Sequence, residues 1–236
     1  MVTWALIGGI IGARVWHLLT PTPSMIEQGL TTYYYLTHPL AAIAVWEGGL
    51  AIFGAVVGGA LAIYIYTRST RQSFLVWADM IAPGLILAQA IGRWGNYINQ
   101  EVYGTPSTLP WAIFIDEFHR LPEFMQFTTY HPLFLYEFLW NILIMALLLW
   151  LDKKLAGWLK NGDIFLFYMI GYPVGRFFLE YLRIDIPLIS GININQAVMA
   201  GVALLAGIVI IIRHRENSTD LVTENPEDTN LDEPIK

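Results

Sequence analysis

The chain has 236 residues, of which 56% are hydrophobic and only 14% are charged. With a mean hydropathy of +0.51, this composition is typical of a protein that lies largely in lipid. The absence of cysteine excludes disulfides, a cysteine nucleophile and thiolate metal sites, and the net charge of −6, to which seven acidic residues after position 215 contribute, gives no support to nucleic-acid binding.

The first predicted membrane helix covers Val2–Leu19, an apolar run long enough to span a bilayer. Its glycines are spaced as in helices that pack closely against a neighbour. Arg14 and His17 lie in its second half, where they either reach toward a membrane interface or line a polar cavity. A loop with prolines and tyrosines follows over residues 20–38 and contains no lysine or arginine.

A second apolar run begins at Pro39, is interrupted at Glu47-Gly48-Gly49 and resumes as far as Tyr66. Because this run is too long for one span and contains a charge beside two glycines, it predicts a short half-helix or re-entrant turn followed by a full helix. A third helix is predicted from Phe74 to about Ile91.

Residues 93–131 mix charged and aromatic side chains, which predicts a small extracytoplasmic subdomain. Residues 216–236 are acidic and predict a disordered cytoplasmic tail after a membrane domain that covers residues 1–215. The fold class is therefore an all-α polytopic membrane protein with about six transmembrane helices and a broken or re-entrant segment. The last three predicted helices are Leu133–Leu151, Ile164–Leu182 and Asn195–Ile212.

The basic residues between these helices predict the orientation of the chain. Lysines and arginines at positions 68, 71, 153, 154, 160, 213 and 215 all fall on the side that holds both termini. Since positive charge favours the cytoplasmic side, both termini should be cytoplasmic. Arg93, the subdomain and Arg183 then belong to the outer side.

Charged residues at the outer ends of apolar runs are the candidates for function, because charge in a membrane is costly. Arg93, Asn96, Asn99 and Glu101 follow the third apolar run, and Arg176, Glu180 and Arg183 share one helical face at spacings i, i+4 and i+7. A structural ion pair between Arg176 and Glu180 would explain the second set alone. Converging arginines also match the geometry of a phosphate, which predicts a site for an anionic lipid headgroup.

Other polar residues have simpler explanations. Glu137 and Asn141 lie one turn apart on the fourth helix, where structural hydrogen bonding explains them better than catalysis. Asp79 is expected to pair within the bundle. The histidines show no metal-ligand spacing, so no metal or other cofactor is expected.

The stretch Gly92-Arg93-Trp94-Gly95-Asn96-Tyr97-Ile98-Asn99-Gln100-Glu101, continued to Gly104, resembles the signature of the prolipoprotein diacylglyceryl transferase family. The resemblance covers nearly the whole membrane part, with its motifs in the family's order. The further matching segments are Trp46-Glu47-Gly48-Gly49, Asp79 with Ala82-Pro83-Gly84, His131-Pro132 with Leu135-Tyr136-Glu137, and Gly175-Arg176-Phe177-Phe178 with Glu180 and Arg183.

This resemblance implies a multi-pass enzyme of the bacterial inner membrane. Its reaction would transfer the diacylglyceryl group of phosphatidylglycerol to the thiol of a lipobox cysteine in a preprolipoprotein, with glycerol phosphate leaving. The partners would be phosphatidylglycerol, signal peptides with a lipobox cysteine and membrane lipid. Catalytic roles are expected for Arg93, Arg176 and Glu101. Substrate-binding roles are expected for Arg93, Asn96, Asn99, Glu101, Gly104, His131, Tyr136, Arg176, Glu180 and Arg183.

The chain departs from the family pattern at two places. Phe53 stands where the family usually has a histidine that is implicated in catalysis, and the chain begins at what resembles the second of seven spans. These departures favour an alternative, a catalytically impaired paralogue that binds anionic phospholipid. A transporter of an anionic solute is a further alternative, based on the break at Glu47-Gly48-Gly49, although no internal repeat supports it.

Overall fold

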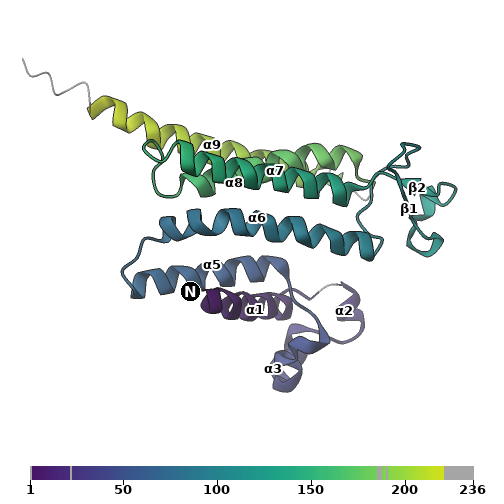
Figure 1. The fold of residues 1–236 in the computed structure, drawn as a ribbon. Coiled ribbons are helices and arrows are strands. Elements are labelled where there is room, and N and C mark those ends of the chain that lie inside the picture. Colours follow the sequence, from purple (N-terminus) through teal and green to yellow (C-terminus); the bar gives the residue numbers. More distant parts are fainter. Residues whose placement is uncertain (1, 22, 185–187, 190, 221–236) are drawn as a thin grey trace, which may run out of the picture. The chain divides into compact units, whose positions relative to one another are not determined.

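The computed structural model describes residues 2–21, 23–184, 188–189 and 191–220. The chain divides into two compact units, Met1–Phe74 and Leu75–Lys236, and each is described by itself (Figure 1). Within the described residues, five helices are long and apolar enough to cross a membrane. The chain is thus an all-α polytopic membrane protein, as predicted. These helices are α1 (Val2–Leu19), α5 (Ile52–Ser69), α6 (Phe74–Ile98), α7 (Leu133–Lys154) and α9, which is apolar enough over Ile194–Arg215.

The helix pair α1 and α5 forms the first unit, in which the two helices lie side by side (Figure 1). Glycines make this close approach possible. A Cβ added to Gly54 would lie 2.2 Å from the carbonyl oxygen of Gly12, and one added to Gly58 would lie 2.3 Å from that of Gly8. The predicted small-residue packing is therefore what holds these two backbones together.

Replacing Gly58 with alanine is expected to destabilise this unit, whereas the same change at Gly59 is not. The new methyl group at position 58 would overlap the backbone of α1, which costs about 1–3 kcal/mol of unfolding free energy. At position 59 the nearest atom is the oxygen of Ala5, 3.5 Å away, which is ordinary contact. Thermal unfolding of the two variants in lipid nanodiscs measures the difference, and equal melting temperatures would contradict this packing.

A broken segment connects α1 to α5. Short helices α2 (Pro23–Glu27), α3 (Thr32–Thr37) and α4 (Pro39–Ile43) precede a 3-10 turn at Val45–Glu47, and Gly48 and Gly49 follow with φ of 88° and 73°. Such left-handed backbone favours glycine. The break predicted at Glu47-Gly48-Gly49 is confirmed. Whether this segment re-enters a membrane stays a prediction.

Arg14 holds this broken segment in place. Its guanidinium donates hydrogen bonds to the carbonyl oxygens of Ala41 (2.6 Å), Ala42 (2.8 Å) and Gly48 (2.6 Å), and only 7% of the residue is exposed. Arg14 therefore does not reach out to an interface. It lines a cavity together with His17, where it supplies the hydrogen bonds that the irregular backbone lacks.

The second unit is built on α6, α7, α8 (Asp163–Leu179) and α9 (Ile194–Asp220). The α8 helix has 17 residues and continues as a 3-10 turn over Glu180–Leu182, so the count of six spans stays a prediction. Ala82 and Ile86 of α6 pack with Ile144 of α7 and Tyr168 of α8 in the apolar core. This packing fixes the three helices that position the candidate site.

The end of α6 differs from the prediction. The helix continues to Ile98, beyond the predicted end near Ile91. Glycines at positions 92 and 95 each disfavour helix by about 1 kcal/mol relative to alanine, but tertiary packing outweighs this cost. The rings of Trp94 and Tyr97 pack against Phe134 of α7 at centroid distances of 5.3 and 4.7 Å. Arg93 and Asn96 therefore lie on the last turns of α6.

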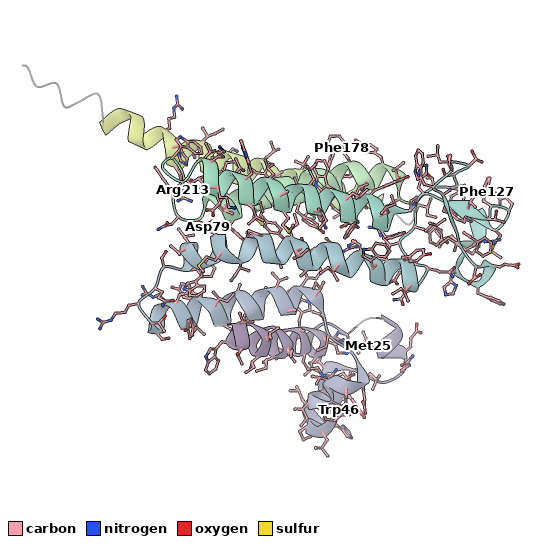
Figure 2. All side chains as sticks on the ribbon, viewed as in Figure 1. Met25, Trp46, Asp79, Phe127, Phe178 and Arg213 are labelled. Carbon is pink, nitrogen blue, oxygen red and sulfur yellow. The ribbon has the colours of Figure 1, made fainter. Side chains whose placement is uncertain are left out.

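Asp79 and Arg213 lie at the end of this unit opposite Phe127 (Figure 2). Asp79 accepts hydrogen bonds from the backbone N–H groups of Gly162 (2.5 Å) and Phe165 (2.9 Å) at the start of α8. Nearby, the fully buried carboxylate of Asp163 pairs with Arg213 at 3.1 Å. The prediction that Asp79 pairs within the bundle is confirmed, and these contacts join α6, α8 and α9.

A small subdomain connects α6 to α7. Strand β1 (Ile113–Phe114) pairs antiparallel with β2 (Thr129–Tyr130). The core of the subdomain consists of Tyr103, Ile115 and Tyr130. Two 3-10 turns, Glu117–His119 and Pro122–Phe124, lie between the strands. Since α6 extends to Ile98, this irregular region begins after that residue. Its place outside the membrane stays a prediction.

The region before and after α9 completes the unit. Strands β3 (Leu188–Ile189) and β4 (Ile192–Asn193) pair antiparallel just before α9. The α9 helix ends at Asp220, so the first residues of the predicted tail are helical. The rest of that tail, residues 221–236, lies outside the described residues.

Candidate functional site

A buried carboxylate lies between two arginines at the centre of the candidate site. Oε1 of Glu137 on α7 lies 3.4 Å from Nε of Arg93 on α6, and its Oε2 accepts a hydrogen bond of 2.8 Å from Nη1 of Arg176 on α8. Only 4% of the Glu137 side chain is exposed, against 25% for Arg93 and 15% for Arg176. Three helices thus place two guanidinium groups on one carboxylate.

Glu180 forms a second charged centre at the end of α8. Its Oε2 lies 3.9 Å from Arg176 and 3.5 Å from Arg183, and its Oε1 accepts a hydrogen bond of 2.8 Å from Asn195. The predicted pair of Arg176 with Glu180 is therefore present, but the contact of Arg176 with Glu137 is shorter. The two carboxylates together hold Arg176 from both sides.

The asparagines extend this network to the end of α6. Asn96 Oδ1 accepts a hydrogen bond of 3.1 Å from Arg93, and its Nδ2 donates one of 3.0 Å to Oε1 of Glu101. Asn99 donates to the same Glu101 oxygen at 3.2 Å. The sequence prediction that Arg93, Asn96, Asn99 and Glu101 act together is consistent with this continuous chain of contacts.

Gly104, His131 and Tyr136 form a separate group. The Nδ1 atom of His131 lies 3.0 Å from the Tyr136 hydroxyl, which also accepts a hydrogen bond of 2.8 Å from Trp111. Gly104 donates its N–H to the His131 carbonyl at 2.9 Å, and a Cβ on Gly104 would lie 2.8 Å from the His131 Cβ. Tyr136 precedes Glu137 on α7, so the group lies beside the arginine network along the chain.

Sequence reasoning assigned Glu137 and Asn141 to structural hydrogen bonding but named no partners for them. Glu137 accepts a hydrogen bond from Arg176 and lies against Arg93, which agrees with this assignment. Within the described residues the side chain of Asn141 makes no hydrogen bond, which does not. One signal could have found Glu137. A carboxylate inside the apolar run of the fourth helix needs a buried partner, and arginines at positions 93 and 176 were available.

The arginines are the part of this network that suits an anion. Three guanidinium groups, those of Arg93, Arg176 and Arg183, face two buried carboxylates, those of Glu137 and Glu180. With the exposed Glu101, which joins the network through Asn96 and Asn99, the formal charges of these six side chains sum to zero. The Nε of Arg93 is buried and forms an ion pair with Oε1 of Glu137 at 3.4 Å, without the geometry of a hydrogen bond to the described residues. Guanidinium groups offer several N–H donors each and match the geometry of phosphate oxygens, so these arginines suit a phosphate.

Comparison with known proteins gives a consistent result. Residues 1–213 match the family model described as prolipoprotein diacylglyceryl transferase. The chain is 48% identical, over 77% of its length, to phosphatidylglycerol–prolipoprotein diacylglyceryl transferase 2 of Streptomyces coelicolor, and 42% identical, over 92%, to the corresponding protein of Frankia alni. It spans 55% of the length of each. It is 39% identical to the Trichormus variabilis protein over 96% of this chain and 78% of that one.

Proposed function

The chain belongs to the prolipoprotein diacylglyceryl transferase family, and from this we propose that it transfers the diacylglyceryl group of phosphatidylglycerol to the thiol of a lipobox cysteine in preprolipoproteins. The observation that supports this function best is the pair of arginines, Arg93 and Arg176, on the buried carboxylate of Glu137. Such an arrangement holds two guanidinium groups ready for a phosphodiester. The relatives' names give the same two substrates for those proteins.

The reaction is a substitution at carbon. The cysteine sulfur attacks the glycerol carbon that bears the phosphate ester, the C–S bond forms, and the C–O bond breaks with its electron pair on the phosphate oxygen. The products are the thioether and glycerol phosphate. The negative charge that develops on the leaving phosphate is stabilised by the guanidinium groups of Arg93 and Arg176 in surroundings of low dielectric constant.

The remaining residues position these arginines. Glu137 holds both guanidinium groups, and Glu180 with Arg183 fixes the second side of Arg176. Asn96, Asn99 and Glu101 extend the network toward the glycerol headgroup. The thiol proton requires an acceptor because an unperturbed cysteine has a pKa of about 8.5. Glu101 or His131 takes this proton in our proposal.

The proposed location is the inner membrane of a bacterium, with both termini in the cytoplasm. The distribution of lysines and arginines supports this orientation. Asp79 and Arg213 then lie at the cytoplasmic end of the second unit, opposite Phe127 (Figure 2). The network around Glu137 then belongs to the outer half, because Arg93 lies on the last turns of α6 whereas Asp79 lies near its start.

Phe53 favours a second candidate function, a copy that binds phosphatidylglycerol without transferring it. The Phe53 side chain is apolar and 70% exposed on α5, with its ring 6.2 Å from that of Trp16. A phenylalanine cannot accept a proton. In this alternative the arginine network binds the lipid and the chemical step is lost.

Replacing Phe53 with histidine separates these two functions. If removal of the thiol proton limits the rate of the reaction, Phe53→His is expected to raise the rate of diacylglyceryl transfer by about 10²-fold, the usual contribution of a general base. Phe53→Asn is the matched control, since it adds polarity without a basic nitrogen. Initial rates of labelled diacylglyceryl transfer measure both variants. No gain with histidine, or an equal gain with asparagine, would show that position 53 does not supply the base.

Complementation tests the proposed function itself. A bacterium depleted of its own transferase is given this chain, and labelled diacylglyceryl on a reporter lipoprotein is scored, with Arg93→Ala as the inactive control. We expect lipidation by the chain and none by the variant. No lipidation by a well-expressed, membrane-inserted chain would contradict the proposal.

A further inference from the structure

A cavity of about 320 Å³ lies in the subdomain next to the arginine network. One wall is the turn that follows α6 and includes Asn99, Glu101 and Val102, and the other walls are formed by His119, Leu121 and Ile184. The cavity belongs to the same subdomain as Phe127, at the end of the unit opposite Asp79 (Figure 2). It is thus separate from the apolar surfaces of the membrane helices.

Internal contacts hold the walls of this cavity. The Gln100 side chain donates to Oδ2 of Asp116 at 2.8 Å and accepts from the Asp116 backbone N–H at 2.6 Å. The Tyr103 hydroxyl donates to the carbonyl of His119 at 2.7 Å and accepts from the N–H of Leu121 at 3.0 Å. The cavity is therefore a formed feature of the subdomain, as binding sites usually are.

The turn beside the cavity is strained. Gln100 and Val102 have φ values of 51° and 53°, in the left-handed region. For a β-branched residue such as Val102 this conformation is a clear outlier and costs of order 1–3 kcal/mol. Strain of this kind persists at sites that bind ligands. It holds Glu101 between two left-handed residues at the wall of the cavity.

The charge of the lining excludes the lipid phosphate as the occupant. The lining residues include one carboxylate, Glu101, and no lysine or arginine. An anion would be repelled here and attracted to the arginine network. The mixture of apolar side chains with hydrogen-bonding groups suits a neutral polypeptide, whose side chains pack on Leu121 and Ile184 and whose N–H groups need acceptors. Glu101 uses only Oε1 for Asn96 and Asn99, which leaves Oε2 for such an N–H.

We propose that this cavity binds the acceptor polypeptide, holding the residues next to the cysteine that is modified. This inference rests on the proposed function, because a transferase must bring its two substrates together. Glu101 lines the cavity and also connects through Asn96 to Arg93. The acceptor therefore lies beside the arginines that bind the lipid phosphate, and Glu101 contacts both sites.

The test measures peptide binding without any transfer. The full chain is placed in nanodiscs of phosphatidylcholine, and the probe is a fluorescent signal-peptide fragment whose lipobox cysteine is replaced by serine. Leu121→Trp and Ile184→Trp fill the cavity and are expected to weaken peptide binding by at least about tenfold. Phe118→Ala is the matched control, because Phe118 lies in the same subdomain, is 99% exposed and does not line the cavity.

Binding of phosphatidylglycerol serves as the check on folding, since both tryptophan variants should bind this lipid as the unmodified chain does. Unchanged peptide binding in both variants would overturn the inference, as would failure of the unmodified chain to bind the peptide. A chain that binds the peptide through this cavity but transfers nothing would support the inference and contradict the proposed function. Failure of the inference about the cavity can therefore be distinguished from failure of the proposed transferase function.

Discussion

Arg93→Ala is expected to reduce diacylglyceryl transfer by about 10³-fold without unfolding the protein. Removing one donor that stabilises charge in a transition state typically costs 10²–10³ in rate, and Arg93 is a charged, planar donor at the centre of the network, 3.4 Å from Glu137. The fold should persist because Glu137 keeps its 2.8 Å contact with Arg176. The quantity to measure is kcat/KM for labelled phosphatidylglycerol, compared between the variant and the unmodified chain.

Two further variants show whether charge or geometry matters at position 93. Arg93→Lys retains the positive charge but loses the planar fork, so it should recover only part of the lost rate. Arg68→Ala removes an exposed arginine at the end of α5, and this variant should transfer the diacylglyceryl group at the rate of the unmodified chain. Normal turnover by Arg93→Ala would remove the basis for a phosphate site at the arginines.

Glu137→Leu is expected to be the most destabilising single change in the second unit. Removal of this carboxylate leaves the guanidinium groups of Arg93 and Arg176 partly buried and close together without their common partner. Removing one partner of a buried ion pair typically lowers the free energy of unfolding by about 3–5 kcal/mol. Chemical unfolding in detergent measures the loss, and Glu123→Leu, at an exposed acid of the subdomain, is the control.

A double variant distinguishes the loss of the ion pair from a loss of packing. If the penalty comes from unpaired guanidinium groups, Arg93→Met should recover part of the stability of Glu137→Leu, because one buried charge then disappears. The two changes would therefore be non-additive. Strictly additive effects, or a Glu137→Leu protein as stable as the unmodified one, would show that Glu137 does not hold the arginines together.

The membrane helices were predictable because hydrophobicity determines them. The first helix covers Val2–Leu19 as predicted, and the break at Glu47-Gly48-Gly49 follows from a charge and two glycines with left-handed backbone. The end of α6 was not predictable in the same way. Its extension to Ile98 depends on contacts of Trp94 and Tyr97 with Phe134, which local propensity does not contain.

In the candidate site too, contacts between distant parts of the chain could not be predicted from local sequence. Charged residues next to or within apolar runs identified Arg93 and Arg176 as candidates, because charge in a membrane is expensive. Their common partner, Glu137, is far from both in sequence, and only the packing of α6, α7 and α8 brings the three together. The contact of Arg176 with Glu180 was predictable because spacing along one helix is enough for it.

The most direct test of the proposed function is the stoichiometry of transfer by the purified chain. Phosphatidylglycerol labelled in its acyl chains and in its headgroup is supplied in proteoliposomes with a peptide that contains one lipobox cysteine. We predict one diacylglyceryl thioether formed for each glycerol phosphate released, both absent in Arg93→Ala. Lipid that binds in an Arg93-dependent manner without either product would contradict transfer, and would identify the chain as a protein that binds phosphatidylglycerol only.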